Sequence, residues 1–261
     1  MKLPKYDFVC SIGHYCATAM YMQRHYLRRM SGPLDWVGRG GEGFETHLRL
    51  LCTDFANFLR KDALLLRINR HRPGIDDMSH DYYFDSVTGM YIFHDFPSGV
   101  PLEESYPEVR RKYDRRIARF YATVKSSKRT LFVYHTRDER LDDRAIVAGM
   151  ADVRKRFAGS AVDLLVIENV PGKDGFDIDK VDSGIYHVRA GLFEQPDDRV
   201  LGNLALGDGI YSLIRCRGML WNRMRPRLLK PLLRLRTAFV FGREARHVAF
   251  KRLVAKYRLR S

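Results

Sequence analysis

Apolar and polar positions alternate along the first part of the chain with two periods. Residues 6–12 form a short apolar run typical of a buried strand, and residues 16–30 repeat apolar side chains at helical spacing. A second helix is expected over 44–59, where one apolar stripe returns every three or four residues. Residues 63–68 suit another strand. The pattern therefore predicts strands joined by helices.

Two aromatic runs within 81–96, separated by Val-Thr-Gly, predict a β-hairpin. Helices and strands then alternate over the following ranges: 102–124 (helix), 130–135 (strand), 142–157 (helix), 162–169 (strand) and 184–190 (strand). Such alternation predicts an α/β fold with a mostly parallel central sheet flanked by helices.

Charge separates the 261-residue chain into two parts. From Arg215 onward there are 15 Lys and Arg residues against one acid, Glu244, which gives +14 of the net charge of +15. We therefore predict an α/β catalytic-like domain over 1–214 and a basic, amphipathic helical tail over 215–261. Such a tail attracts anionic surfaces.

The tail has two interpretations, which the sequence leaves open. Residues 243–260 place apolar side chains near one helical face, with bases around them. The helix either docks on the body with its bases in water, or lies on an anionic bilayer, as Trp221 favours. The chain has no apolar leader and no apolar run of about 18 residues, the length that a membrane span needs. We expect a cytoplasmic protein, peripheral to the inner membrane under the second interpretation.

The sequence gives weaker support for a nucleic-acid partner or a metal site. Basic clusters suit phosphate contact, but no DNA- or RNA-reading motif is present. The cysteines form no C-x-x-C pair, and His14 with Cys16 would be a lone His-x-Cys pair. We predict no metal site and no required cofactor, and we rank nucleic acid below an anionic membrane as a partner.

Cys16 occupies the turn between the first strand and the first helix. Helix N-termini present free N–H groups and the positive end of the dipole, so we expect a lowered pKa and a reactive thiolate. The same N–H groups suit an oxyanion. The alternative is an inert buried cysteine, as is common for this residue type.

A nucleophilic thiol needs a base, and nine histidines are available. His94 ends an aromatic strand, from which a side chain can project rigidly, and His135 at the end of the 130–135 strand is the reserve. The alternative for each is a hydrogen-bonded structural histidine.

The stretch "SIGHYCATAMYMQRHYLRRMSGPLDWV" resembles the opening of a bacterial family of papain-like cysteine peptidases of unknown function. Its matching elements are Ser11, Gly13, Cys16, Pro33, Leu34, Asp35 and Trp36. "YIFHDF" resembles the second block of that family, with His94 and Asp95 in the matching places. The similarity spans roughly residues 6–170. It implies an α/β papain-like body with a Cys–His site.

A third residue should orient the histidine. Asp35 and Asp95 are the favoured candidates, although neighbouring strand side chains such as His94 and Asp95 point to opposite faces. Asn169 would keep the chain order Cys, His, Asn. The ordinary role of each is a turn or cap hydrogen bond.

The leading hypothesis is a cysteine-dependent acyl-transfer enzyme, a papain-like hydrolase or peptidase in which Cys16 attacks a carbonyl and His94 moves the proton. Its substrate would be a peptide, a glycan or another acyl donor. Outline similarity to capsule-biosynthesis proteins implies an alternative, a coenzyme A-dependent acyltransferase of surface polysaccharide biosynthesis. Bases that could meet its phosphates are Arg110, Arg111, Lys112, Arg115, Arg116 and Arg119. A third hypothesis is a non-catalytic membrane-surface or polysaccharide-assembly protein that acts through its tail.

Overall fold

The computed structural model describes residues 3–13, 16–38, 43–67, 80–193 and 201–218. The chain divides into two compact units, Met1–Arg217 and Gly218–Ser261. The predicted amphipathic tail helix and its membrane contact lie outside the described residues, and so does His14.

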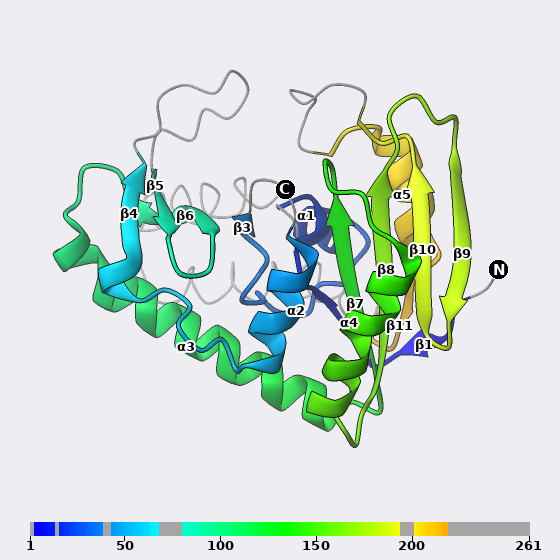
Figure 1. Cartoon of the computed structure of the whole chain (residues 1–261), viewed down its shortest axis with the longest axis horizontal. Coiled ribbons are helices and arrows are strands. Elements are labelled where there is room, and N and C mark those ends of the chain that lie inside the picture. Colours follow the sequence, from blue (N-terminus) through cyan, green and yellow to red (C-terminus); the bar gives the residue numbers. More distant parts are fainter. Residues whose placement is uncertain (1–2, 14–15, 39–42, 68–79, 194–200, 219–261) are drawn as a thin grey trace, which may run out of the picture. The chain divides into compact units, whose positions relative to one another are not determined.

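One of the sheets of the first unit has five strands (Figure 1). Its strands lie in the order β2 (Phe8–Ser11), β7 (Arg129–Thr136), β8 (Ala161–Asn169), β10 (Ile185–Ala190) and β9 (Phe176–Asp182). The first four are parallel, and β9 pairs with β10 in the antiparallel sense. The carboxyl ends of β2, β7, β8 and β10 therefore meet at one edge, where open α/β sheets bind ligands.

Helices cover both faces of this sheet. On one face, α2 (Phe44–Cys52) and α4 (Asp143–Arg156) share a core with alternate residues of β7 and β8. The intervening strand residues are also buried, but they belong to the opposite face. There α1 (Ala17–Arg24) packs against β7 and α5 (Leu204–Ser212).

A second sheet is antiparallel throughout. Its order is β3 (Val37–Gly38), β6 (Met90–Pro97), β5 (His80–Asp85) and β4 (Leu64–Arg67), and α3 (Leu102–Ser126) packs against β6 (Figure 1). The protein is thus a mixed α/β protein with one mixed sheet and one antiparallel sheet, so the predicted single, mostly parallel central sheet is not confirmed. The short turn between β5 and β6 permits only antiparallel pairing, because parallel neighbours need a crossover of a dozen or more residues.

The remaining elements are small. A 3-10 turn spans Lys61–Ala63, and β1 (Lys5–Tyr6) pairs in parallel with β11 (Arg215–Cys216). Residues 215–217, assigned to the tail by charge alone, consequently lie in the first unit.

Two helices end earlier than their apolar patterns predict. Instead of continuing to residue 30, α1 stops at Arg24, and Tyr26 has a left-handed φ of 57°. Likewise α2 stops at Cys52, and Asp54 and Phe55 are left-handed. Phe55 is still buried, so the apolar stripe continues through a non-helical turn.

Candidate active site

Cys16 is the N-cap residue of α1, at the carboxyl edge of the five-stranded sheet. The predicted position at a strand-to-helix corner is therefore confirmed. The expected lowered pKa is wrong. Burial raises the pKa of the Cys16 thiol, and its backbone amide and the charge of Arg137 oppose this only in part. The resting group is a thiol near neutral pH.

Gly13 connects three elements at this corner. Its carbonyl accepts the backbone N–H of His135 at 3.1 Å and the hydroxyl of Thr18 at 3.0 Å. The first bond prolongs the β2–β7 ladder, and the second fastens the first turn of α1 to it. A Cβ at Gly13 would lie 2.5 Å from Nε2 of His47, and the φ of Gly13 is +120°. Only glycine suits this position.

His135 lies at the carboxyl end of β7, next to this corner. Its side chain is 1% exposed, and neither ring nitrogen has a hydrogen-bond partner among the described residues. Burial, and then the charge of Arg137, lower the pKa of His135 to about 3. The ring is neutral and contacts Phe193, with centroids 5.8 Å apart.

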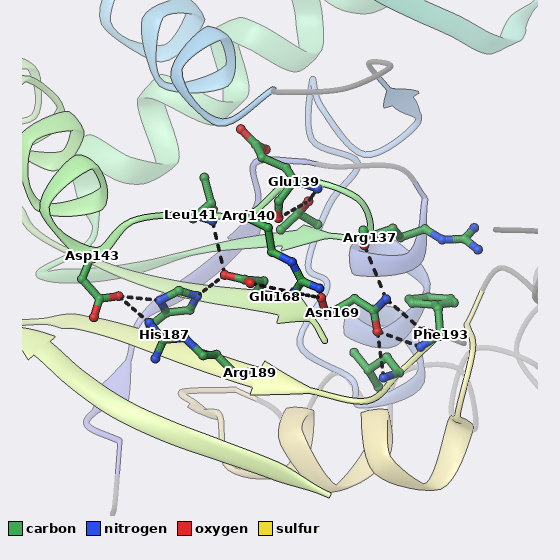
Figure 2. A network of polar contacts seen from close by, with 12 residues as sticks. Arg137, Glu139, Arg140, Leu141, Asp143, Glu168, Asn169, His187, Arg189 and Phe193 are labelled. Carbon is green, nitrogen blue, oxygen red and sulfur yellow. Dashed lines mark hydrogen bonds and ion pairs between the residues drawn. The ribbon is translucent and has the colours of Figure 1, made fainter. Parts of the chain in front are cut away.

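Asn169, the alternative third residue, ends β8 and holds the loop that follows β10. Its side-chain oxygen accepts the N–H groups of Leu192 and Phe193, and its amide donates to the carbonyls of Phe193 and Arg137 (Figure 2). The guanidinium of Arg137 in turn lies 4.2 Å from the centre of the Phe193 ring. Asn169 thus positions the loop that carries Phe193 against His135.

His94 lies in the second sheet, on β6, where the pairing with β5 shifts register. Bulges of this kind re-aim side chains. The His94 ring meets the edge of Trp36 at 6.0 Å between centroids and that of His80 at 6.4 Å. The described contacts of His94 therefore join it to β5 and Trp36.

Asp35 belongs to the same surroundings as His94. It is 2% exposed, forms an ion pair with Arg28 at 2.6 Å and accepts the N–H of Gly32 at 2.9 Å. Arg28 also lies over the Trp36 ring, 5.3 Å from its centre. Burial raises the pKa of Asp35, although Arg28 and Gly32 oppose this. These contacts explain Asp35 as the residue that fixes Arg28 and Trp36.

Asp95 faces α3. Its carboxylate accepts the Tyr113 hydroxyl, lies 2.5 Å from Nζ of Lys112 and 3.8 Å from Arg116. These partners are phenol and basic groups of one helix, so the contacts explain Asp95 as an anchor of α3 on β6.

Some basic side chains of α3 form hydrogen bonds and ion pairs within the protein. Arg110 binds Asp114 and the carbonyl of Phe58, and Arg111 binds the carbonyl of Pro107. Within the described ranges, no group of three or more His, Cys, Asp and Glu residues could hold a metal ion.

Sequence reasoning missed His47 and Glu139. The His47 ring is buried between Gly13 and Tyr134, and its Nδ1 lies 2.6 Å from the Gly43 carbonyl. Glu139 accepts the N–H groups of Gly43 and Phe44 and the Tyr134 hydroxyl. It thereby caps α2 from a loop 95 residues away in sequence, which no local pattern indicates.

The family model described as "Putative papain-like cysteine peptidase (DUF1796)" matches residues 7–168. The chain belongs to this family. The match contains Gly13 and Cys16 and extends to Glu168, the next-to-last residue of β8. The predicted resemblance is thereby confirmed.

An uncharacterized protein, R408, of Acanthamoeba polyphaga mimivirus is 29% identical over 139 residues, 49% of this chain and 60% of the viral protein. The chain thus matches less than two thirds of that relative. No solved structure matches the chain. In the part of the chain that the structure describes, no helix has the length and apolar character to cross a bilayer.

Proposed function

We propose that the protein is a cysteine hydrolase of the papain-like kind, with Cys16 as its nucleophile. The observation that carries this proposal is the place of Cys16: it begins α1 at the edge where four parallel strands end. Family membership, over a match that includes Cys16, supports the same reaction class. A peptide or isopeptide is the substrate that the family description favours.

The chemistry needs a base, because the raised pKa of Cys16 keeps the sulfur protonated at rest. An imidazole takes the thiol proton as the sulfur attacks the carbonyl carbon, and the backbone amides at the start of α1 receive the oxyanion. The imidazolium then returns the proton to the leaving amine as the C–N bond breaks. Water finally hydrolyses the thioester.

Peptide hydrolysis tests the proposal. The wild-type protein and its Cys16→Ser variant are incubated with a mixed peptide pool, and new termini are counted by mass spectrometry. Cys16→Ser should lose activity by about 10³-fold or more, as removal of a nucleophile does. Cys52→Ser is the matched control, because Cys52 is also half-buried but ends α2. Undiminished cleavage by Cys16→Ser would refute the proposal.

Acyl transfer passes through the same thioester, and the acceptor alone separates it from hydrolysis. Repeating the assay with an acyl-coenzyme A as donor tests this alternative, because only a transferase moves the acyl group to a second molecule. The tail-based membrane hypothesis instead predicts salt-sensitive liposome binding that survives Cys16→Ser.

A further inference from the structure

We infer that Arg137 is the cation that stabilises the negative charge formed at Cys16, an inference that rests on the proposed hydrolase function. In that reaction the sulfur becomes a thiolate as its proton leaves, and the attacked carbonyl oxygen becomes an oxyanion. Both charges form at the corner that Cys16 occupies, and the fold holds Arg137 at the same edge of the sheet.

The backbone of Arg137 leaves the five-stranded sheet beside this corner. The strands β2 and β7 are parallel neighbours, and the bond from the N–H of His135 to the Gly13 carbonyl, at 3.1 Å, prolongs their ladder. Arg137 follows His135 by two residues, and Cys16 follows Gly13 by three. Asn169 fixes the strand end, because its side-chain amide donates to the Arg137 carbonyl at 3.4 Å. The two residues therefore extend from adjacent strands beyond one edge.

The guanidinium of Arg137 lies on the face of the sheet that α1 covers. Tyr134 packs on Phe44 of α2, so its neighbour His135 points to the opposite face, where α1 packs against β7. The Phe193 ring contacts His135 there, and the guanidinium lies over the same ring, 4.2 Å from its centre. Figure 2 shows the side chain of Arg137 extending from the strand end toward Phe193. The charge is thus held on the side of the helix that Cys16 begins.

The aromatic contact keeps this charge in one place. Arginine stays protonated throughout the range in which enzymes work, and it stacks on aromatic faces. The backbone of Phe193 is itself fixed, because the Asn169 side-chain oxygen accepts the N–H groups of Leu192 at 3.0 Å and of Phe193 at 2.8 Å. A cation held in this way needs no reorganisation when a negative charge forms nearby.

The charge of Arg137 reaches the groups at the corner. It opposes the rise that burial causes in the pKa of Cys16, and together with burial it lowers the pKa of His135. Burial outweighs Arg137 in the resting protein, so that Cys16 remains a thiol. The attraction acts fully only when a thiolate or an oxyanion is present, and a partly buried site strengthens it. Arg137 therefore favours the charged states of the reaction over the resting state.

Alkylation with two reagents of different charge tests the inference without a known substrate. In both reactions the Cys16 sulfur forms a C–S bond and displaces iodide, but iodoacetamide is neutral and iodoacetate is an anion. The rates at Cys16 are measured by mass spectrometry from pH 6 to pH 10 in the wild type and in variants of Arg137, with Cys52 as internal reference.

Arg137→Gln should raise the pH midpoint of the Cys16 profile and slow iodoacetamide at pH 7 by about threefold or more. It should slow iodoacetate by about tenfold or more, because the cation attracts this reagent as well. Arg137→Lys keeps the charge and should retain about half or more of each wild-type rate. Arg144→Gln is the matched control: it removes an exposed cation from the start of α4 and should change both rates less than about twofold.

A second neutral variant, Arg137→Met, keeps an apolar stem against Phe193 in case Arg137→Gln fails to fold, and urea unfolding shows which variants fold. It should lose the preference for iodoacetate in the same way. An unchanged ratio of the iodoacetate rate to the iodoacetamide rate in the neutral variants would overturn the inference. An equal fall of this ratio in Arg137→Lys or in Arg144→Gln would overturn it too.

The hydrolase proposal fails separately. Loss of hydrolysis in Cys16→Ser together with normal alkylation in Arg137→Gln would remove the role of Arg137 and retain the hydrolase. Retained hydrolysis in Cys16→Ser would instead remove the proposed function and with it the reaction that Arg137 assists.

Discussion

The buried ring of His187 places its Nε2 3.0 Å from Oε2 of Glu168 (Figure 2). Its Nδ1 lies 2.6 Å from Oδ1 of Asp143. Ionised carboxylates only accept hydrogen bonds, so both contacts are satisfied together when the ring carries both protons. The His187 imidazole, in contact with both carboxylates, thus joins β8, β10 and the start of α4.

Replacing His187 should destabilise the fold strongly. His187→Leu leaves the 5%-exposed Glu168 with only Arg140 and one backbone N–H, and the loss of a hydrogen-bond partner is costly for a buried carboxylate. We expect a loss of about 2–4 kcal/mol in the free energy of unfolding, measured by urea denaturation at pH 7. His25→Leu is the control: it breaks a contact with Asp208 near the surface and should cost less than about 1 kcal/mol. Equal losses of unfolding free energy in His187→Leu and His25→Leu would contradict the stabilising role of the buried His187 contacts.

Asp143 should make the fold sensitive to acid. Burial pushes its pKa up, but the hydrogen bonds and charges of His187 and Arg189 outweigh this and hold the pKa below its ordinary value. The unfolded chain then takes the proton first as pH falls, so stability is present above the unfolded pKa of about 3.9 and is lost below it. Urea unfolding between pH 5 and pH 3 should show a shallower decline in Asp143→Asn than in the wild type. Parallel declines would exclude this contribution.

Long periodic segments were predictable from the sequence. The helix expected over 102–124 is α3 (Leu102–Ser126), and the strand expected over 130–135 is β7 (Arg129–Thr136). In both, an uninterrupted apolar pattern coincides with the packing that the fold provides. The antiparallel edge strand β9 was missed, because its apolar residues Phe176, Ile178 and Val181 are only partly buried among charged ones and its pairing with β10 makes it a strand.

The site was predictable only as far as local effects govern it. The corner at Cys16 follows from the neighbouring sequence, and so does the expectation of a dipole-stabilised thiolate. Burial decides the actual pKa, and burial depends on elements distant in sequence. Likewise, nothing near His135 in the sequence indicates that both its nitrogens are buried with no hydrogen-bond partner among the described residues.

Gly13 should tolerate no side chain. In Gly13→Ala the new Cβ would meet the His47 ring, and a φ of +120° strains any L-residue. We expect a loss of about 2 kcal/mol or more by urea unfolding, with slower alkylation of Cys16 as the corner shifts. Gly99→Ala is the matched control, because its φ is +74° but no atom lies within 4 Å of its Cβ. It should lose about 1 kcal/mol, and a similar loss at both positions would contradict the steric argument.

Asp95 should act on stability rather than on the chemistry of Cys16. Asp95→Asn weakens its bonds to Tyr113 and Lys112, which attach α3 to β6, and should cost about 1–3 kcal/mol by urea unfolding. The exposed Asp114→Asn, which breaks a pair with Arg110 on the same helix, should cost less than about 0.5 kcal/mol. Because the partners of Asp95 all lie on α3, the pH profile of Cys16 alkylation should stay unchanged. A shifted profile with normal stability would show instead that Asp95 orients a catalytic imidazole.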